Sequence, residues 1–502
     1  MAEGAIRPQT AIPLLLLAIV AFTVYSPSTT APYYGDDFEF VFDESAPIYS
    51  HLFRDNPVNG FYRPIQSIFM ALVQRLWGLD PAPIHLVQVL FHFFVSCIVF
   101  LTIRGMKYST LQAILGSLFM LVSQANAHAV LSNDTLSQTS GTLFGFMAVV
   151  LTLQRPTEAK ILEDSNQIRR STFPLILLAL FLSLFSKECG VAYSIMIVGV
   201  YAARFRGMSR GSVVRHLLGR IVPVLIVVSS YVVVRCFVAG LQPQFGSGGY
   251  DFYLGMNIIR NNVLCIGAAA VPLSSVDAFS AYRTGEIFSL SVVVGLTAVF
   301  LATVVFGLVL SRQHCRRILL FTAFFFIGLW PMVLMNHVSE LYVYNSMPFF
   351  SVLVGVGLGN VLEYIKEKRV VYVGFWIALI LLFSSHIFAV RGKARMMRTN
   401  GERAAVLLRG IERYVGCVPE GGRLVLVNPP TGGHQYSIFR VNGFNVLRNG
   451  LHRIHQTSHR TDFGIEIIDV KTAAEEGAVP DTFSVTACPS DGWAVREFRR
   501  MP

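Results

Sequence analysis

Charged residues are scarce in this chain. Asp, Glu, Lys and Arg make up only 14% of its 502 residues, whereas 53% are hydrophobic, and the mean hydropathy is +0.55. So little charge excludes an ordinary soluble domain and predicts a polytopic α-helical membrane protein. The net charge of +11 would indicate a nucleic-acid partner in a soluble protein. Here the basic residues lie in short loops between apolar runs, so we expect the lipid bilayer and no nucleic acid as a partner.

Paired cysteines and a signal-peptide cleavage site are missing as well. The seven cysteines are scattered singly with no CxxC pair, which argues against a zinc site or a redox motif. Cys417 and Cys488 could form a disulfide in an oxidising compartment, although two separate thiols fit the sequence equally well. No A-x-A-like site follows the first apolar run, so we interpret that run as a membrane anchor.

Long apolar runs dominate the first 390 residues. Each approaches the roughly 20 residues that a transmembrane helix requires, so the sequence predicts about 11 transmembrane helices. The expected spans lie near residues 10–26, 83–103, 110–126, 134–153, 172–186, 190–203, 221–240, 287–311, 318–335, 347–363 and 370–390.

Basic loops set the expected orientation. They follow alternate spans, at Arg104 and Lys107, from Arg155 to Arg170, from Arg204 to Arg220, at Arg312, Arg316 and Arg317, and at Lys366, Lys368 and Arg369. Basic loops are cytoplasmic by the positive-inside rule, which places the N-terminus in the cytoplasm and residues 27–82 and 391–502 on the opposite face. Residues 257–272 would break this alternation if they crossed, so we expect a re-entrant or interfacial helix there. The short loops favour a bacterial inner membrane over the endoplasmic reticulum.

The tail differs in character from the apolar part. "RLVLVNPP" and "TFSVTACPS" read as short strands, and "GERAAVLLRGIERYV" reads as an amphipathic helix. The expected organisation is therefore a membrane domain over 1–390 and a small soluble non-cytoplasmic α/β domain over 391–502.

The first outer loop is acidic. "YYGDDFEFVFDE" holds five carboxylates, and its Asp36 and Asp37 follow the predicted membrane exit by about ten residues. Carboxylates held at the interface beside aromatic side chains gain raised or split pKa values, whereas a solvated acidic loop is the alternative. Further along, residues 64–77 show the spacing of an amphipathic helix on the membrane surface, with Pro64 in its first turn. Arg63 precedes this helix, where it could meet a substrate phosphate or simply anchor a lipid headgroup.

Several short motifs occur in a particular order. They are "GDD", "YRPI", "LWGLDPAPIH", "LFH", "NAHAVLSNDT", "SKECGV" and "SELYVYNSMPF". This set resembles the membrane part of the transmembrane and tetratricopeptide-repeat O-mannosyltransferases and their bacterial relatives, which belong to the GT-C superfamily and take a sugar from a polyprenyl-phosphate carrier. The resemblance covers roughly residues 10–390. The tetratricopeptide repeats are absent, and Leu341 stands where the family pattern has an arginine, so one expected cation is missing.

The resemblance implies a catalytic base in the first loop. An interfacial carboxylate can take the proton of an acceptor hydroxyl once its pKa is raised, and this role falls on Asp36 or Asp37. The same pair could instead hold Mg²⁺ or Mn²⁺ against the phosphate. The sequence supplies no firm third ligand, so the metal stays unknown and no cofactor is assigned.

The leaving phosphate needs cations on the same face. The candidates at the outer membrane exits are Arg63, Lys187 and His337. Lys187 and Glu188 interrupt two apolar runs, where a charge is costly unless it has a partner or snorkels to water. The residues that could line a substrate groove are His85, His92, Asn133, Asp134, Glu188, Glu340, Tyr342 and Tyr344. Structural roles are open to most of them too: packing for the histidines, a helix cap for Asn133 or Asp134, and an interfacial belt for the tyrosines.

Two functional classes fit this sequence. The favoured one is an integral membrane glycosyltransferase, mannosyltransferase-like, that moves a sugar from a polyprenyl-phosphate donor to a hydroxyl of a protein, glycolipid or cell-envelope polysaccharide. The competitor is a transporter or flippase of a lipid-linked sugar, for which paired half-chain repeats with mid-membrane polar residues would be expected. No such repeat is visible in the sequence, and the ionisable residues gather at one face. An inactive scaffold with the same fold is the third possibility.

Overall fold

The computed structural model describes most of the apolar part and selected elements of the tail. The described residues are 8–40, 47–53, 61–154, 166–205, 208–239, 253–272, 274, 278, 281–282, 284–311, 314–330, 332–335, 339–415, 423–428, 439, 441, 443–451, 464–469, 482–487 and 495–500.

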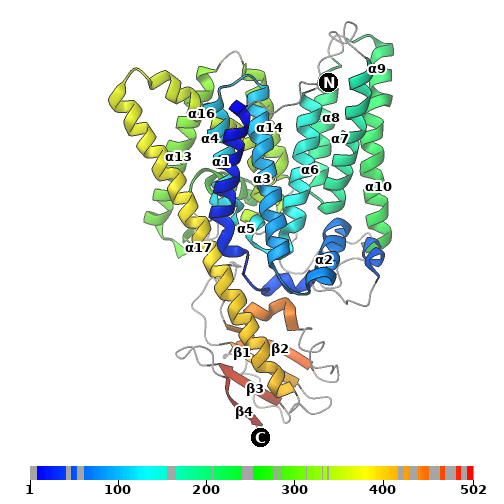
Figure 1. Ribbon diagram of the computed structural model, residues 1–502, viewed down its shortest axis with the longest axis vertical. Helices are drawn as coiled ribbons and strands as arrows, with labels where there is room; N and C mark the ends of the chain where they lie inside the picture. Colours follow the sequence, from blue (N-terminus) through cyan, green and yellow to red (C-terminus); the bar gives the residue numbers. More distant parts are fainter. Residues whose placement is uncertain are drawn as a thin grey trace.

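A bundle of helices forms the larger part of the molecule (Figure 1). Its long elements are α1 (Pro8–Tyr25), α3 (Ala82–Gly105), α4 (Thr110–Val122), α6 (Leu136–Leu153), α7 (Asn166–Ser186), α8 (Gly190–Ala203), α10 (Val222–Ala239), α13 (Ile287–Leu310), α14 (Cys315–Leu329), α16 (Met347–Ile365) and α17 (Arg369–Val415). Each expected apolar run therefore contains one of these helices. Seven described helices are long and apolar enough to cross a bilayer, or eight if the bent pair Thr110–Val122 and Gln124–Leu131 is one span. The number eleven stays a prediction.

Close backbone contact holds the centre of the bundle together. A Cβ built on Gly116 of α4 would lie 2.7 Å from the carbonyl oxygen of Ser351 in α16, and one built on Gly307 of α13 would lie 1.9 Å from that of Gly357, also in α16. Glycine permits this because it has no side chain between the two helices. The start of α4 is set by a capping box in which the side chain of Ser109 accepts from the backbone of Gln112 and the side chain of Gln112 accepts in return.

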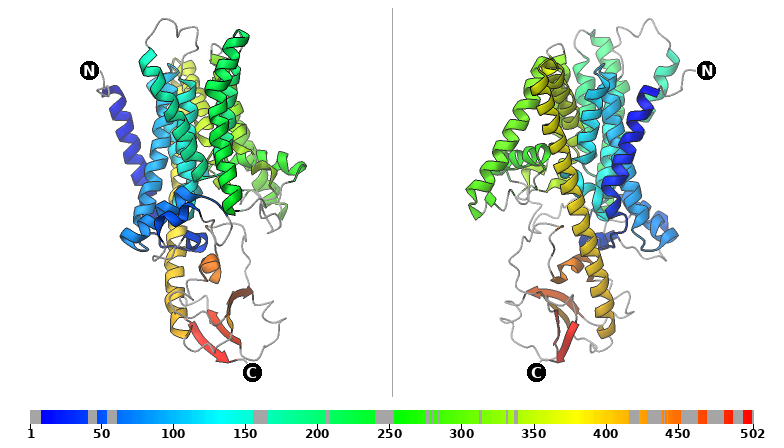
Figure 2. Two further views of the ribbon diagram at one scale, coloured as in Figure 1. Left: turned by 90° about the vertical axis from the view of Figure 1, so that its right-hand side faces the viewer. Right: turned by 60° about the vertical axis from the view of Figure 1, so that its left-hand side comes forward.

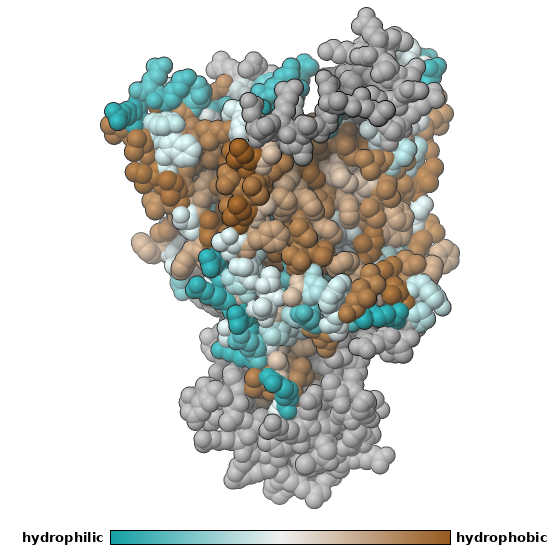
Figure 3. Space-filling model, viewed as in Figure 1, coloured by the Kyte–Doolittle hydropathy of each residue, from teal (hydrophilic) through white to brown (hydrophobic). Residues whose placement is uncertain are grey.

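The two ends of the bundle differ. The short helix α9 (Arg210–His216) lies at the end opposite to the sheet, and hydrophobic side chains cover the middle of the bundle between two hydrophilic ends (Figures 1 and 3). At the sheet end lies α2 (Pro64–Trp77), which has the predicted bounds and carries Pro64 in its first turn. The helix predicted over 257–272 is α11 (Met256–Ala270). At 15 residues it is about 22 Å long, short of the ~30 Å apolar core of a bilayer, and it lies across the direction of α10 and α13 (Figure 2).

Helix α17 joins the bundle to the tail. It has 47 residues and is therefore about 70 Å long. The expected span at 370–390 and the expected amphipathic helix at 401–415 are thus parts of one helix and not separate elements. Residues 391–400 contain no proline, so nothing in the backbone ends the helix between them.

A four-stranded sheet lies beyond this helix, in the order β2-β1-β3-β4. The predicted strands are β1 (Arg423–Asn428) and β3 (Thr482–Ala487), while β2 (Gly464–Asp469) and β4 (Val495–Arg500) were not predicted. β1 pairs in parallel with β2 and β3, and β4 pairs antiparallel with β3. Leu426 of β1 is fully buried, and its backbone pairs with Ile467 in β2 and Val485 in β3.

Candidate functional site

The acidic pair lies in a short 3-10 helix, η2 (Gly35–Phe40), at the sheet end of the bundle. Gly35 begins it with φ +57°, a left-handed conformation that favours glycine. Asp36 is partly exposed, whereas only 1% of Asp37 is exposed. The two neighbouring carboxylates therefore occupy different environments.

Asp37 is surrounded by hydrogen-bond donors. Its Oδ1 accepts from the Asp134 backbone N–H at 3.1 Å and lies 3.3 Å from the Ser132 hydroxyl, and its Oδ2 accepts from the Asn133 amide at 3.1 Å and the Tyr34 backbone N–H at 3.2 Å. Burial and the nearby charge of Asp134 nevertheless raise the pKa of Asp37 to about 7, while the hydrogen bonds from Asn133, Tyr34 and Asp134 oppose this shift. The carboxylate thus has its acceptor positions filled by the protein.

Asp134 is a partly exposed carboxylate in the short segment Asn133–Thr135, which contacts Asp37. The Ser132 hydroxyl donates to its Oδ1, and the Gln66 amide of α2 donates to its backbone carbonyl at 2.6 Å. The interpretation of Asn133 or Asp134 as a helix cap is wrong. Thr135 is the residue that caps α6, without a side-chain bond, because the side chain of Asn133 is turned toward Asp37 instead.

Lys187 is a buried cation. Only 3% of it is exposed, and its Nζ lies 5.9 Å from the centre of the Tyr342 ring. Among the described residues, its ammonium group has no hydrogen bond or ion pair. Burial, and then the charge of Arg63, lower its pKa to about 8, against the opposing charges of Glu188 and Asp134. A buried ammonium without a hydrogen bond or ion pair is costly.

Arg63 turns into the protein instead of anchoring a lipid headgroup. Its Nη2 lies 3.5 Å from Oε2 of Glu188, and its guanidinium lies 4.3 Å from the centre of the Phe61 ring. Burial would raise the pKa of Glu188, but the charges of Arg63 and Lys187 outweigh it and lower that pKa. The alternative of a Lys187–Glu188 hairpin that snorkels to water is therefore wrong, since Lys187 is buried and Glu188 pairs with Arg63.

Glu340 has a cation partner that the sequence did not reveal. This residue begins the short helix α15 (Glu340–Val343), is 4% exposed, and forms an ion pair with Nζ of Lys393 from α17. The same Nζ donates to Oε1 of Gln124 at 2.6 Å. The cation beside Glu340 thus comes from a lysine 53 residues away in sequence.

One tail residue reaches this ion pair. Lys393 lies 5.0 Å from the centre of the Phe439 ring, and the ring of His128 meets the same phenylalanine edge-on. The Asn400 amide donates to the Phe439 carbonyl at 3.1 Å. The 3-10 helix η10 (Gly443–Gly450) packs on η2, so the tail touches the acidic segment as well.

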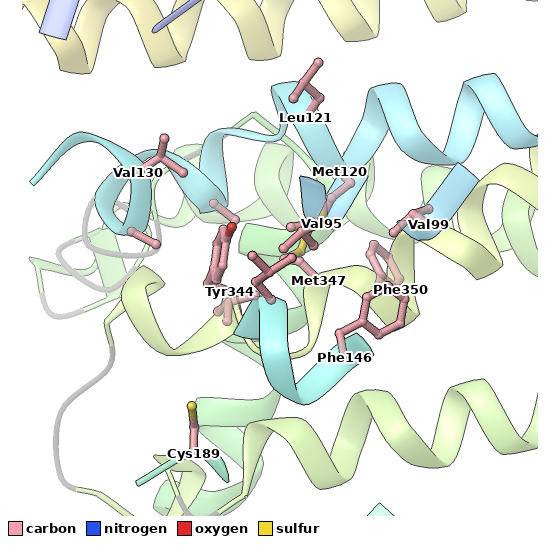
Figure 4. Packing of buried hydrophobic residues seen from close by; sticks show 14 of the residues in the cluster. Val95, Val99, Met120, Leu121, Val130, Phe146, Cys189, Tyr344, Met347 and Phe350 are labelled. Atoms are coloured by element: carbon pink, nitrogen blue, oxygen red, sulfur yellow. The ribbon is translucent and has the colours of Figure 1, made fainter. Parts of the chain in front are cut away.

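Three aromatic groove candidates are core residues. Tyr344 is fully buried, donates to Nδ1 of His92 at 3.0 Å and packs among Val95 and Met347 (Figure 4). His92 holds its Nε2 3.0 Å from the Leu121 carbonyl, which can only accept, so this nitrogen carries the proton. Tyr344 therefore lines neither a groove nor an interfacial belt, and His92 does not line a groove. His85 is also fully buried. Tyr342, in contrast, faces Lys187.

Some predicted groups lie outside the described residues, namely His337, Cys417 and Cys488. In the part of the chain that the structure describes, no three His, Cys, Asp or Glu side chains gather in a way that could hold a metal ion. A divalent cation at the acidic pair stays a prediction from the sequence.

The chain is an integral multi-pass membrane protein whose ionisable residues gather at one end of the helical bundle, and its fold is shared with a solved structure. No protein-family model matches it, and no curated protein matches it. Among solved structures it is similar to apo ArnT from Cupriavidus metallidurans, with a TM-score of 0.52 at 13% identity over 94% of this chain and 92% of that one.

A weaker similarity joins it to the Archaeoglobus fulgidus oligosaccharyltransferase tethered with an acceptor peptide, with a TM-score of 0.48 at 11% identity over 91% of this chain and 64% of that one. At 13% identity the similarity to ArnT shows a shared fold and no more. The resemblance stated from the sequence is thereby confirmed at the level of the fold.

Proposed function

We propose that this protein is a membrane glycosyltransferase that moves a sugar from a polyprenyl-phosphate donor to an acceptor hydroxyl. The observation that carries the proposal is the buried ammonium of Lys187, which lies near the charge of Asp134 and has no hydrogen bond or ion pair in the described part of the chain. A cation and carboxylates at the same end of the bundle support the proposal, because a lipid-linked substrate would present its phosphate there.

The proposed reaction follows from these groups. The acceptor oxygen forms a bond to the anomeric carbon of the sugar while the bond from that carbon to the phosphate oxygen breaks. Asp36 takes the proton of the acceptor hydroxyl, and the polyprenyl phosphate leaves with the electron pair of the broken bond. The phosphate gains one negative charge in this step, so Lys187 and then Arg63 stabilise the transition state more than the ground state.

Asp36, and not Asp37, is the base in this proposal. A base must lie within hydrogen-bond reach of the acceptor hydroxyl, and Asp37 is buried with three N–H donors already on its two oxygens. Asp36 is partly exposed and follows Gly35 in the same short helix. Asp37 is then a positioning residue that ties the first outer segment to residues 132–134, and Asp134 is the second carboxylate at the surface of the site.

The overall organisation is part of the proposal. We place the tail and the site on the non-cytoplasmic face of a bacterial inner membrane, with about 11 transmembrane helices, because basic residues follow alternate apolar runs. The four strands and η10 then form the small α/β domain expected over 391–502, and their contact with η2 puts this domain beside the acceptor side of the site. Neither the sugar nor the kind of acceptor is specified by these residues.

The proposed lipid-phosphate carrier rests on the charged residues of this chain. ArnT from Cupriavidus metallidurans has also been solved bound to undecaprenyl phosphate. That ligand belongs to that protein, and for this chain the assignment rests on Lys187, Arg63 and the position of the site at one end of an apolar bundle.

A transfer assay tests the proposal. The purified full chain in nanodiscs is supplied with undecaprenyl-phosphate sugars and with cell-envelope extract as acceptor, and release of undecaprenyl phosphate is followed by mass spectrometry. We expect release that depends on acceptor and is lost in Asp36→Asn. A flippase would instead move the intact donor between leaflets without releasing the phosphate, and a scaffold would do neither. Either outcome contradicts the proposed function.

A further inference from the structure

Helix α2 carries two buried glutamines that the proposed reaction does not use. Gln66 is fully buried and Gln74 is 4% exposed. Their positions in the chain differ by eight, which corresponds to about 12 Å along the axis of an α-helix. A side-chain amide is costly to bury without a hydrogen bond, so each of the two needs a partner inside the protein.

Both amides donate to the backbone of the segments that carry the carboxylates. Nε2 of Gln66 donates to the carbonyl of Asp134 at 2.6 Å. Nε2 of Gln74 donates to the carbonyl of Phe40 at 2.6 Å, and Phe40 is the last residue of η2, the short helix that contains Asp36. One helix therefore holds both acidic segments, namely η2 and residues 132–134.

The same helix follows a cation that we assign to the donor phosphate. Arg63 directly precedes Pro64, the first residue of α2, and its Nη2 lies 3.5 Å from Oε2 of Glu188. At the other end, Gly78 follows the last residue of α2 with φ +63°, a left-handed conformation that favours glycine. A single helix of 14 residues thus connects Arg63 to both acidic segments.

We propose that Gln66 and Gln74 are positioning residues, which hold the two acidic segments at a fixed place relative to Arg63 and so place Asp36 opposite the leaving phosphate. The inference rests on the proposed function, since it concerns the geometry of that transfer. It assigns neither glutamine a contact with the substrate.

The physical reason is the geometry of a direct displacement. The acceptor oxygen and the leaving phosphate oxygen lie on opposite sides of the anomeric carbon, so the base must stand at a defined distance from the cations that hold the phosphate. An error of about 1 Å in such an arrangement can lower the rate about a hundredfold. The hydrogen bonds of Asp37 join the two acidic segments to each other. Those of Gln66 and Gln74 join both segments to α2, and hence to Arg63.

Two alternative roles of the glutamines lead to different results. If they only stabilised the fold, their loss would lower the melting temperature and leave kcat of the folded protein unchanged. If they bound the acceptor, more acceptor would be needed for half-maximal rate while kcat stayed the same. Under our proposal kcat falls, whereas affinity for the donor phosphate is kept because Glu188 still holds Arg63.

The experiment measures two quantities for the full chain in nanodiscs: acceptor-dependent release of undecaprenyl phosphate from its sugar conjugate, and binding of undecaprenyl phosphate itself. The variants are Gln66→Met and Gln74→Met, which keep the length of the side chain and remove its amide. Melting temperatures are recorded beside both quantities.

Gln112→Met is the matched control. Gln112 is also buried, and its amide donates to Oδ1 of Asn360 at 2.7 Å. It lies in the first turn of α4, and this helix starts at the end of the bundle opposite to the sheet (Figure 1). The control therefore removes the same kind of hydrogen bond at a distance from the acidic segments.

We expect Gln66→Met and Gln74→Met each to lower kcat about tenfold or more, with the affinity for undecaprenyl phosphate within about threefold of the wild type. All three variants should lower the melting temperature, because each leaves a buried polar group without its partner. Gln112→Met should keep the kcat of the wild type. If a Met variant does not fold, the Asn variant at the same position, which is too short to reach the carbonyl, takes its place with the same expectation.

Three results would overturn the inference: wild-type kcat in a folded Gln66→Met or Gln74→Met, a loss of kcat in Gln112→Met as large as in these two, or a raised acceptor requirement with unchanged kcat. Failure of the proposed function is distinct, because then the wild type itself would release no undecaprenyl phosphate in the presence of acceptor.

Discussion

The backbone N–H of Asp134 donates a hydrogen bond to the carboxylate of Asp37 at 3.1 Å, and this contact joins two segments 97 residues apart in the sequence. It fixes the segment that carries Asp36 and Asp37 against residues 132–134, which precede α6, and Asp36 remains partly exposed. Asp36 is partly exposed and Asp37 is buried, and this difference leads to the first prediction.

Asp36→Asn should mainly reduce sugar transfer, whereas Asp37→Asn should mainly reduce stability. Loss of the base should reduce transfer by at least about a hundredfold, while the melting temperature changes little because Asp36 is partly exposed. Asp37→Asn puts an amide N–H₂ against hydrogen-bond donors, which should destabilise the protein by about 1–3 kcal/mol. Transfer assays and thermal unfolding of both variants check this. A stable, fully active Asp36→Asn would remove the assignment of the base.

The stability of the protein should depend on pH through Asp37. Its folded pKa, about 7, lies above the ordinary value of 3.8, so the folded state holds this proton more tightly than the unfolded state. The contribution therefore favours folding below about pH 4 and is lost progressively as the pH rises through 7. Melting temperatures from pH 5 to 8 should fall more steeply for the wild type than for Asp37→Asn. Parallel slopes would contradict the raised pKa.

Binding of the donor phosphate should weaken in alkaline solution. The lowered pKa of Lys187, about 8, means that its charge is lost above this pH in the free protein. Affinity for undecaprenyl phosphate should then fall by up to about tenfold per pH unit above 8. Lys187→Arg stays charged and should keep its affinity to higher pH. Equal pH profiles for the two proteins would show that Lys187 does not meet the phosphate.

The contact between α13 and α16 gives a matched test of packing. A Cβ on Gly307 would lie 1.9 Å from the carbonyl oxygen of Gly357, whereas a Cβ on Gly295 of the same α13 meets nothing within 4 Å. Gly307→Ala should therefore cost about 1–3 kcal/mol of stability. Gly295→Ala should be neutral or stabilising by up to about 1 kcal/mol, because alanine favours helix. Thermal unfolding of the two variants in the same detergent checks this, and equal melting temperatures would contradict the close contact at Gly307.

The contact between α17 and Pro32, which precedes the acidic pair, allows a second comparison of two glycine variants. A Cβ on Gly401 would lie 2.2 Å from the carbonyl oxygen of Pro32, while one on Gly392, earlier in the same helix, has no neighbour within 4 Å. Gly401→Ala should displace the segment that carries Asp36 and lower transfer about tenfold or more. Gly392→Ala should leave transfer unchanged. A fully active Gly401→Ala would show that this contact does not position the acidic pair.

Much of the fold could be predicted from the sequence, since apolar runs and turn residues are local signals. The bounds of α2 follow from helical periodicity and Pro64, and β1 and β3 stand out as apolar stretches beside proline or glycine. β2 and β4 were missed because their sequences, "GIEIID" and "VREFRR", carry charges within the strand. Hydropathy shows where the apolar part of α17 ends, but it does not show that the helix itself continues into the tail.

The charged residues of the candidate site could be picked out from the sequence, but their contact partners could not. The two aspartates, Arg63 and Lys187 could be singled out as candidates because charges beside apolar runs are conspicuous. Their partners come from segments far away in sequence, such as Asn133 for Asp37 and Lys393 for Glu340, and no local pattern encodes such contacts.

Because α17 passes without a break from the bundle to the sheet, it acts as a lever. A tilt of about 5° at its membrane end would move the far end of this roughly 70 Å helix by about 6 Å. Transmembrane helices tilt to match the thickness of the surrounding bilayer. Lipids of different chain length should thus shift the tail relative to the acidic segment, and the thickness of the membrane becomes a variable to control in any kinetic measurement.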